Sequence, residues 1–377
     1  MKITGIICEY NPLHLGHKRQ LDAIKAENSG IVCLMSGNFV QRGQPAIIGK
    51  MARAKAAVDS GADLVLELPV TYALRSAEGF AAGGVDILGK FCDYLSFGAE
   101  TADKNALTDT AKALLAPAFS DALRQELEKG LSFPVARQNA LAAMGLSSTL
   151  LETPNNILAV EYCKAIIRGG YSTEPLPLQR NGGYHDQKPD EQEPSATAIR
   201  KLMMDGADWF SYVPQSFDNT QLHHISYGER AILTRLRTMT DEEFEALPFG
   251  SEGLWRKLMH ESRRQATLED ILTAVKSKRY TRTRLDRMVM CAFLGITEEM
   301  MAVPAPYVRV LAFNDKGREI LKKARKTGEF INIGQPANHA WEAFENRCTD
   351  LYGLFAKDLS PAGTEPEKRI YYKKNGT

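Results

Sequence analysis

Short apolar runs alternate with helix-like segments along the first hundred residues. The apolar runs are Ile3–Cys8, Gly30–Met35, Asp63–Leu68 and Tyr94–Gly98. They are nearly continuous in apolar residues, which is typical of parallel strands that are covered on both faces. The segments with helical periodicity between them are Leu15–Lys25, Lys50–Asp59 and Ser76–Lys90. Strands joined by crossover helices predict an α/β fold with a doubly wound, Rossmann-like parallel sheet.

The pattern becomes mainly helical after residue 103. The predicted helices are Asp103–Leu115, Ser120–Lys129, Pro134–Met144 and Asn156–Arg168. A strand over Glu174–Arg180 leads into a polar surface loop over residues 181–194, of the kind that often covers a binding site. Ser195 then caps a helix that runs to about Met204.

The second half of the chain has a different pattern of residues. Residues 225–300 are helical and rich in arginine, and two more strands are predicted over Tyr307–Phe313 and Phe330–Ile333. Because domains typically contain roughly 100–200 residues, the 377 residues predict two of them. We expect an α/β domain over residues 1–205 and a mainly helical α+β domain over residues 206–377.

Composition is that of an ordinary globular protein, with 44% hydrophobic and 25% charged residues. The 47 basic residues nearly balance the 46 acidic ones, which excludes a protein whose main task is to coat nucleic acid. Residues 1–205 contain 21 basic and 23 acidic side chains, and residues 206–377 contain 26 and 23. The neutral total therefore combines a slightly acidic half with a slightly basic one.

Two absences in the sequence predict a cytoplasmic location. No apolar run approaches the roughly 18 residues that span a membrane, and the N-terminus lacks the apolar core of a signal peptide. Six cysteines lie far apart without a CxxC pair, as expected of reduced core residues.

A basic segment stands out between Trp255 and Met290. It contains ten Lys or Arg side chains against four acidic ones, with aromatic residues between them. This combination suits phosphates and unpaired bases, and a solvated helical surface is an equally good explanation. The candidate tRNA-binding residues here are Arg279, Arg282, Arg284 and Arg287.

The strongest chemical signal is the run from Glu9 to His17, which reads EYNPLHLGH, at the junction of the first strand and the first helix. The carboxyl ends of parallel strands form the ligand crevice of such sheets, and a helix N-terminus binds phosphate. His14 and His17 share one helix face, and Gly16 permits close approach. The two imidazoles are predicted to stabilise phosphoryl or nucleotidyl transfer as hydrogen-bond donors. No metal site is predicted, because suitably spaced carboxylates or cysteines do not follow.

A second helix N-terminus carries Ser195, Thr197 and Arg200. Two hydroxyl groups and free backbone N–H groups can hold phosphates, while Arg200 supplies a cation for pyrophosphate. Simple helix capping by Ser195 is the alternative. Together with the histidine motif, this element predicts a clamp for a triphosphate.

These two elements resemble the HxGH nucleotidylyltransferase superfamily. The chain is similar, more specifically, to the bacterial tRNA(Met) cytidine acetate ligase family over nearly its whole length. The segments that carry the resemblance are GIICEYNPLHLGH, MSGNFVQRGQPAI, DLVLELP, SFGAE, PNNILAVEY, GGYHD, SATAIRK and YVRVLAFNDKGR. Leu13 and Leu15 stand where a Phe and a small polar residue are expected, and neither departure removes an imidazole.

The resemblance implies a two-step ligase reaction. Acetate attacks the α-phosphate of ATP, with Mg²⁺ as the counter-ion of ATP, and N4 of the wobble cytidine of elongator tRNA(Met) then takes the acetyl group. The resemblance further implies that residues 1–205 form the ATP-binding domain and that residues 206–377 form the domain that binds tRNA. No protein partner is expected. Two alternatives remain: a small-molecule adenylyltransferase of the nicotinate mononucleotide or pantetheine phosphate type, and an RNA-binding module without activity.

The resemblance also implies which residues bind ATP, with His14 and His17 as the catalytic pair. The expected ATP-binding residues are Ile7, Cys8, Glu9, Tyr10, Asn11, Pro12, Leu13, Leu15, Gly16, Lys18, Arg19, Gln20, Gly98, Asn155, Asn156, Arg180, Ser195, Thr197 and Arg200. Capping of a helix is an equal explanation for the asparagine pair, and a surface ion pair is one for Arg180.

Residues 36–43 follow the second strand and face the same crevice. We expect Asn38, Gln41 and Arg42 to bind acetate, phosphate or the incoming cytidine. Phe39 is a candidate for stacking on a base.

Overall fold

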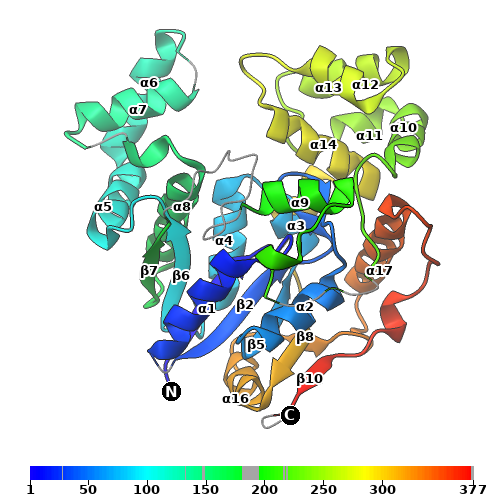
Figure 1. The fold of residues 1–377 in the computed structure, drawn as a ribbon. Helices are drawn as coiled ribbons and strands as arrows, with labels where there is room; N and C mark the ends of the chain where they lie inside the picture. Colours follow the sequence, from blue (N-terminus) through cyan, green and yellow to red (C-terminus); the bar gives the residue numbers. More distant parts are fainter. Residues whose placement is uncertain are drawn as a thin grey trace.

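The computed structural model describes residues 1–27, 29–131, 133–146, 149–180, 195–214, 217 and 220–374 (Figure 1). The predicted loop over residues 181–194 lies outside this set. One sheet has the strand order β10-β8-β5-β2-β1-β6-β7, and β9 pairs with β8. The strands are β1 (Ile3–Cys8), β2 (Gly30–Ser36), β5 (Leu64–Leu68), β6 (Tyr94–Ala99), β7 (Glu174–Gln179), β8 (Val308–Asn314), β9 (Phe330–Asn332) and β10 (Tyr371–Lys373).

The predicted α/β fold with a doubly wound, mostly parallel sheet is confirmed. In the register, Ile3 of β1 faces Gly30 of β2 and Thr4 faces Tyr94 of β6, both in parallel. Only β8 runs antiparallel to a neighbour, β5, among the described strand pairs of this sheet. The division into two domains at residue 205 remains a prediction, and three strands from beyond it join the sheet that the N-terminal half begins.

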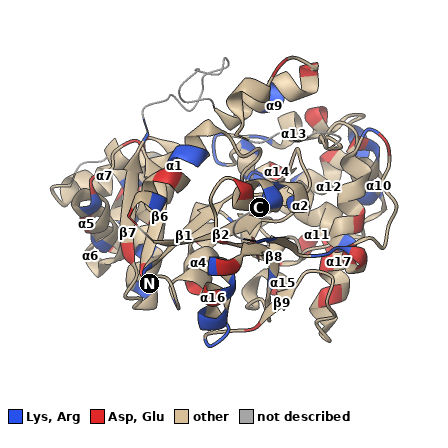
Figure 2. Ribbon diagram, turned by 60° about the horizontal axis from the view of Figure 1, so that its bottom comes forward, with Lys and Arg blue, Asp and Glu red and all other residues tan. Residues whose placement is uncertain are grey.

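Helices cover both faces of the sheet, which Figure 2 shows nearly edge-on. On one face lie α1 (Leu15–Ala26) and α2 (Lys50–Asp59), whose Leu21 and Ala54 share a buried cluster with Ile6 of β1. The helices of the other face are α4 (Ala77–Leu88), α8 (Pro154–Gly169) and α16 (Asp315–Ala324). Burial on both sides explains why the strands read as continuous apolar runs.

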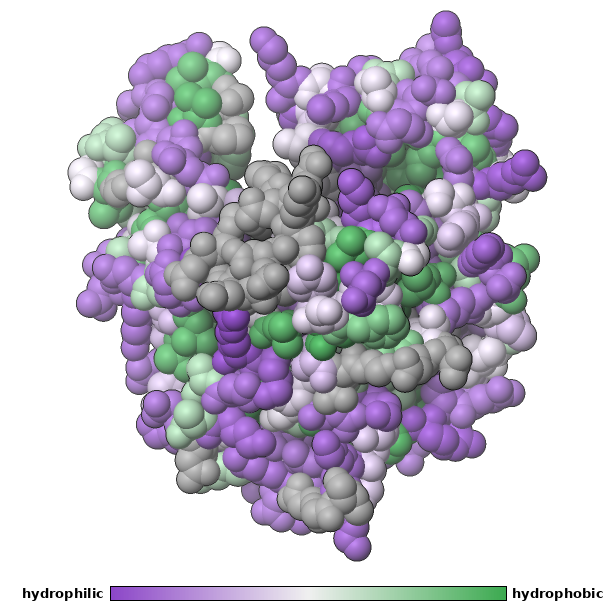
Figure 3. All heavy atoms as spheres, viewed as in Figure 1, coloured by the Kyte–Doolittle hydropathy of each residue, from purple (hydrophilic) through white to green (hydrophobic). Residues whose placement is uncertain are grey.

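Two helical lobes stand above the carboxyl ends of the parallel strands (Figure 1). The first contains α5 (Lys104–Leu115), α6 (Pro117–Glu128) and α7 (Phe133–Ala143). The second contains α10 (Glu229–Thr238), α11 (Asp241–Glu245), α12 (Leu254–Arg264), α13 (Leu268–Val275) and α14 (Arg282–Leu294). Figure 3 shows the two lobes separated from each other at the top of the molecule.

Several shorter elements connect these parts. The helices are α3 (Val70–Ala73), α9 (Ala196–Asp205), α15 (Glu298–Ala302) and α17 (Ala340–Tyr352). A hairpin of β3 (Phe39–Val40) and β4 (Gln44–Pro45) follows β2. Turns of 3₁₀ helix cover Thr149–Leu151, Phe210–Tyr212, Gly353–Phe355 and Glu365–Glu367.

Buried ion pairs attach the C-terminal segment to the sheet. Glu365, which is 1% exposed, accepts hydrogen bonds from Lys50 of α2 and Arg309 of β8. Lys50 also contacts Glu67 at 2.8 Å, and Arg309 contacts Glu345 at 3.1 Å. Because removing one partner of such a buried group typically costs about 3–5 kcal/mol, this cluster fixes the C-terminal segment in place.

All six cysteines are buried and free. Within the described part of the chain, the helices are too short or too polar to cross a membrane.

Candidate active site

The loop between β1 and α1 is anchored in the core, and residues 10–14 are buried. Tyr10 has a φ of 46°, and the peptide bond between Asn11 and Pro12 is cis. Tyr10 and Leu13 are 1% and 0% exposed, and Asn11 Oδ1 accepts a hydrogen bond of 2.7 Å from the backbone N–H of Ile47. The side chains of Tyr10 and Leu13 therefore pack into the core and fix the loop. Only the backbone of these two residues can face a ligand.

His14 and His17 come together at the first turn of α1, as predicted. His14 is the N-cap, and its Nδ1 accepts a hydrogen bond of 3.1 Å from the backbone N–H of Gly16. His17 Nδ1 accepts in turn from the backbone N–H of His14 at 3.3 Å. The rings stack with centroids 3.7 Å apart. Since a neutral imidazole that accepts at Nδ1 carries its proton at Nε2, both rings present an Nε2–H donor.

Burial keeps both imidazoles neutral. It lowers the pKa of His14 to about 3, with the charges of Arg180 and Arg200 acting in the same direction. Burial also lowers the pKa of His17, helped by His14 and Arg180. Neutral Nε2–H groups beside two guanidinium groups form an electrostatically positive surface without a protonated histidine, which suits the charge that builds on a phosphate under attack.

Arg180 reaches the histidines across a glycine. A Cβ on Gly98, at the end of β6, would lie 2.8 Å from Arg180 Cδ, so the absence of a side chain at Gly98 makes room for the arginine. The backbone N–H of Arg180 donates to Ala99 O at 2.9 Å, which fixes the start of its side chain. The two residues, predicted separately as ATP contacts, are thus parts of one arrangement.

Arg200 approaches from α9. Its Nη1 donates to Asn11 O at 2.7 Å and its Nη2 to Thr197 Oγ1 at 3.0 Å. Ser195 Oγ accepts from the backbone N–H of Ala198 at 3.1 Å, so Ser195 is the N-cap of α9. The N-termini of α1 and α9 therefore meet at the same edge of the sheet, as the predicted triphosphate clamp requires.

The asparagine pair at the start of α8 holds a neighbouring loop. Asn155 Nδ2 donates to Glu100 Oε1 at 2.7 Å. Asn156, which is 2% exposed, accepts from the backbone N–H of Thr101 at 2.9 Å through Oδ1. Glu100 Oε2 accepts from the backbone N–H of Asn156 at 2.8 Å. Glu100 thus occupies the N-terminus of α8, a role that the sequence did not predict, and Asn155 is the half-buried member of the pair.

The remaining predicted ATP contacts lie on β1 or the exposed side of α1. Ile7 and Cys8 are buried strand residues, whereas Leu15 and Gly16 are half-buried. Lys18 pairs with Asp22, Arg19 is exposed, and Gln20 donates to Ser96 Oγ at 3.1 Å.

Arg53 is a buried side chain that holds the loops of the site, and the sequence analysis did not predict this role. It is 0% exposed, and its guanidinium donates to Ile48 O at 2.7 Å, Glu9 O at 2.6 Å and Ser36 O at 3.0 Å. A hydrogen bond to Gly37 O completes the set. One buried side chain therefore ties the loop after β1 to the loop after β2. Nothing in the local sequence distinguishes it from the exposed arginines of other helices.

Residues 36–43 are divided between core and surface. Phe39 is 1% exposed and packs edge-on against Tyr352 and Phe355, so the expectation that it stacks on a base is wrong. Asn38 is 7% exposed and accepts from the backbone N–H of Lys50, so it is a structural residue. Gln41 and Arg42 lie at the tip of the β3–β4 hairpin.

The four predicted tRNA-binding arginines are engaged with other groups of the second lobe. Arg279 pairs with Glu252, and Arg282 pairs with Glu269 at 2.7 Å and Asp286 at 2.8 Å.

Arg284 donates to Phe249 O at 2.7 Å. Arg287 is 8% exposed and lies over the Phe249 ring. Arg279 and Arg282 are therefore the members of the set that are best placed to meet a large partner.

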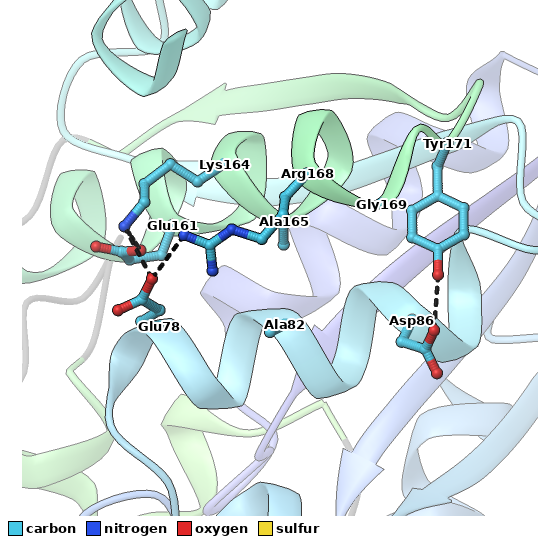
Figure 4. A pocket seen from close by; sticks show the side chains of 9 residues that line it. All are labelled: Glu78, Ala82, Asp86, Glu161, Lys164, Ala165, Arg168, Gly169 and Tyr171. Carbon is cyan, nitrogen blue, oxygen red and sulfur yellow. Dashed lines mark hydrogen bonds and ion pairs between the residues drawn. The ribbon is translucent and has the colours of Figure 1, made fainter. Parts of the chain in front are cut away.

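A surface pocket of about 180 Å³ lies elsewhere, between α4 and α8 (Figure 4). Its charged groups are paired with one another, as in the contact of 3.2 Å between Lys164 and Glu78 and the hydrogen bond of 2.7 Å between Tyr171 and Asp86. Over the described residues, no group of three or more His, Cys, Asp or Glu side chains is arranged to hold a metal ion.

Comparison with known sequences gives one consistent result. A model of the family described as HIGH Nucleotidyl Transferase matches residues 1–366. A tRNA(Met) cytidine acetate ligase of Clostridium novyi is 37% identical over 403 aligned positions, which cover 99% of this chain and 100% of the relative. One from Thermosipho melanesiensis is 37% identical over 363 positions, covering 90% and 85%.

Solved structures agree. The apo structure of Thermotoga maritima TmcAL superposes with a TM-score of 0.90 at 28% identity, and both chains are covered completely. The structure of the same protein bound with alpha-thio ATP superposes with a TM-score of 0.87, again over both complete chains.

Proposed function

Because the chain belongs to the HIGH nucleotidyl transferase family and, within it, to the tRNA(Met) cytidine acetate ligases, we propose that it acetylates tRNA(Met) at the expense of ATP. In the first step, a carboxylate oxygen of acetate attacks the α-phosphate of ATP, and pyrophosphate leaves. In the second, N4 of the wobble cytidine of elongator tRNA(Met) attacks the acyl carbon of acetyl-adenylate. The new bond joins N4 to the acetyl group, AMP leaves, and the amine loses one proton.

The observation that carries the proposal is the pair of Nε2–H donors of His14 and His17 between Arg180 and Arg200. A neutral imidazole can donate to a non-bridging oxygen of the α-phosphate as charge builds there. It does not repel the cations that hold the β- and γ-phosphates. In this arrangement the imidazoles act at the reacting phosphorus, and the two guanidinium groups hold the leaving pyrophosphate.

The ATP site combines the loop over residues 7–20 with Gly98, Asn155, Arg180 and the start of α9. We infer that Mg²⁺ enters as the counter-ion of ATP and is carried by the phosphates. The chemistry of the side chains supports this, because arginines and imidazoles dominate the described site and attract phosphate rather than a divalent cation.

The two helical lobes above the carboxyl ends of the parallel strands support a large acceptor. A small-molecule adenylyltransferase needs no second lobe, and this lobe adds the exposed cations Arg279 and Arg282. The reaction with tRNA belongs in the cytoplasm, in agreement with the free cysteines.

Incubation of the protein with ATP, labelled acetate and bulk tRNA tests the proposal. We expect label in tRNA, located in N4-acetylcytidine after digestion to nucleosides. Turnover of ATP only with a nucleotide monophosphate would establish the small-molecule adenylyltransferase instead, and binding of tRNA without ATP turnover would establish an inactive RNA-binding module.

A further inference from the structure

The β3–β4 hairpin connects the catalytic loop to the second lobe. The backbone N–H of Gln41 donates to Glu9 Oε1 at 2.8 Å. Gly43, with a φ of 75°, lies so close to α14 that a Cβ there would be 2.4 Å from the backbone nitrogen of Arg287. Since Phe39 fixes the base of the hairpin in the core, the tip at Arg42 is held between the histidine loop and the arginine-bearing helix.

The side chain of Arg42 is exposed at this tip. Its charge acts on Arg200. Burial lowers the pKa of Arg200, the charge of Glu9 raises it, and the charge of Arg42 lowers it further. The charges that act on His14 are those of Arg180 and Arg200. The hairpin contacts place Arg42 between the histidine loop and α14, close enough to Arg200 for the two charges to interact.

The proposed reaction needs two anion sites, one for ATP and acetate and one for the tRNA backbone. Arg180 and Arg200 are the cations beside the imidazoles, where the phosphates of ATP react. Acetate must also lie there, because its oxygen attacks the α-phosphate. Arg42 adds an exposed guanidinium at the hairpin tip beside this site, and the acceptor is itself a polyanion.

We propose that Arg42 binds a backbone phosphate of the tRNA next to the cytidine that is acetylated. The inference rests on the proposed function and names a residue that positions the acceptor. A base that reacts at a buried site must leave its stack, which exposes its flanking phosphates. A guanidinium matches a phosphate with two parallel hydrogen bonds, and the fixed hairpin tip places this contact at a set distance from the imidazoles.

The test compares Arg42→Gln with the wild type in both half-reactions. Acetate-dependent exchange of labelled pyrophosphate into ATP reports the first step, and acetyl transfer to tRNA reports the second. We expect exchange within about twofold of wild type and a KM for tRNA raised by about 10- to 100-fold, as for loss of a charge-assisted hydrogen bond. The slope of log Kd for tRNA against log salt should fall by about 0.7 to 0.9.

Two further variants control for the hairpin itself. Gln44→Ala removes an exposed side chain from the same hairpin and should leave the KM values for tRNA and acetate unchanged. Arg42→Lys keeps the charge without the two-pronged contact, so the salt slope should stay and the KM for tRNA should rise only several-fold. If Arg42→Gln fails to fold, Arg42→Lys takes its place as the test. A several-fold higher KM for tRNA in Arg42→Lys, with an unchanged KM for acetate, then supports the inference.

Several results would overturn the inference. A raised KM for acetate with normal tRNA affinity would assign Arg42 to the acetate site. Unchanged kinetics in both steps would make it a surface residue. Failure of the proposed function is visible separately, because the wild type itself would then transfer no acetyl group to tRNA.

Discussion

The Nδ1 atom of His17 accepts a hydrogen bond from the backbone N–H of His14, and the two rings stack 3.7 Å apart. The contact caps the helix and also fixes the tautomer of the imidazole. It satisfies a backbone donor of the first turn, and it leaves the proton of the ring on Nε2. Gly16 is required between the rings, because a Cβ there would lie 3.0 Å from His14 Cε1.

Substitution of His14 separates capping from chemistry. Asn caps helices well and Ala does not, so His14→Asn should retain about 1 kcal/mol of stability that His14→Ala loses. Both variants lose the Nε2–H donor, and both should lower kcat for ATP consumption by about 10²- to 10³-fold, the typical effect of removing one such donor. Urea denaturation and steady-state kinetics measure the two effects, and tRNA binding should stay unchanged.

Activity of His14→Asn near the wild-type level would contradict the catalytic role. Loss of activity in His14→Ala alone, together with its loss of stability, would reduce the histidine to a helix cap. His17→Ala should behave like His14→Ala in ATP consumption.

The low pKa values of the histidines predict a pH dependence of stability. An unfolded histidine takes up a proton near pH 6.5, whereas folded His14 does so near pH 3 and His17 well below its usual range. Their contribution is fully present above pH 6.5 and is lost as the pH falls towards 3. Each group lowers the unfolding free energy by about 1.4 kcal/mol per pH unit in this window.

Denaturation of wild type and of a His14→Asn, His17→Asn double variant at pH 7, 6, 5 and 4.5 measures the effect. The wild type should lose about 2–3 kcal/mol more per pH unit between pH 5.5 and 4.5 than the variant does. His223, whose pKa burial lowers to about 4, is present in both proteins and cancels. Parallel curves would show that the imidazoles titrate normally.

Gly98→Ala tests whether Arg180 serves ATP or only a surface ion pair. The added Cβ would meet the flexible Arg180 side chain at 2.8 Å, so the arginine should move while the strand survives. We expect the KM for ATP to rise about tenfold, equivalent to about 1.4 kcal/mol, with little change in Tm. Gly49→Ala is the matched control, because the nearest atom to its Cβ is 4.0 Å away. An unchanged KM in Gly98→Ala would leave Arg180 as a surface charge.

The arginines of the second lobe predict a graded response to salt. Arg279→Gln and Arg282→Gln should weaken tRNA binding, and each should lower the salt slope by about 0.7 to 0.9 if its arginine binds one phosphate. Glu252→Gln should tighten binding, because it releases Arg279 from its ion pair. Arg287→Gln should lower the free energy of unfolding and leave the salt slope of tRNA binding nearly unchanged, since this side chain is largely buried. Equal affinities in all four variants would identify a solvated surface.

Local patterns were enough to predict seven of the strands and the histidine motif, whereas β3, β4 and β10 were not predicted. The α2 helix has the predicted bounds Lys50–Asp59, and β1 has the predicted bounds Ile3–Cys8. These bounds follow from hydrophobic periodicity, and the histidine pair follows from a cap formed within four residues at the start of α1. The motif around His14 and His17 was recognisable for the same reason.

Features that depend on distant parts of the chain were missed. Arg53 finds its acceptors on two separate loops, and Glu100 caps a helix that begins at Pro154. The place of Phe39 after a strand favours an exposed residue that stacks on a base, yet the lobe formed far along the sequence buries it. Periodicity carries no information about such partners, so only the folded structure identifies them.

Attack of acetate on the α-phosphate is the central claim, and transfer of oxygen tests it most directly. When acetate labelled with ¹⁸O in both carboxylate oxygens reacts, one labelled oxygen bonds to the α-phosphorus and stays there as N4 displaces AMP. Mass spectrometry of the products should find one ¹⁸O in AMP and one in the acetyl group on tRNA, with unlabelled pyrophosphate. Unlabelled AMP, or ADP with ¹⁸O in inorganic phosphate, would contradict the account.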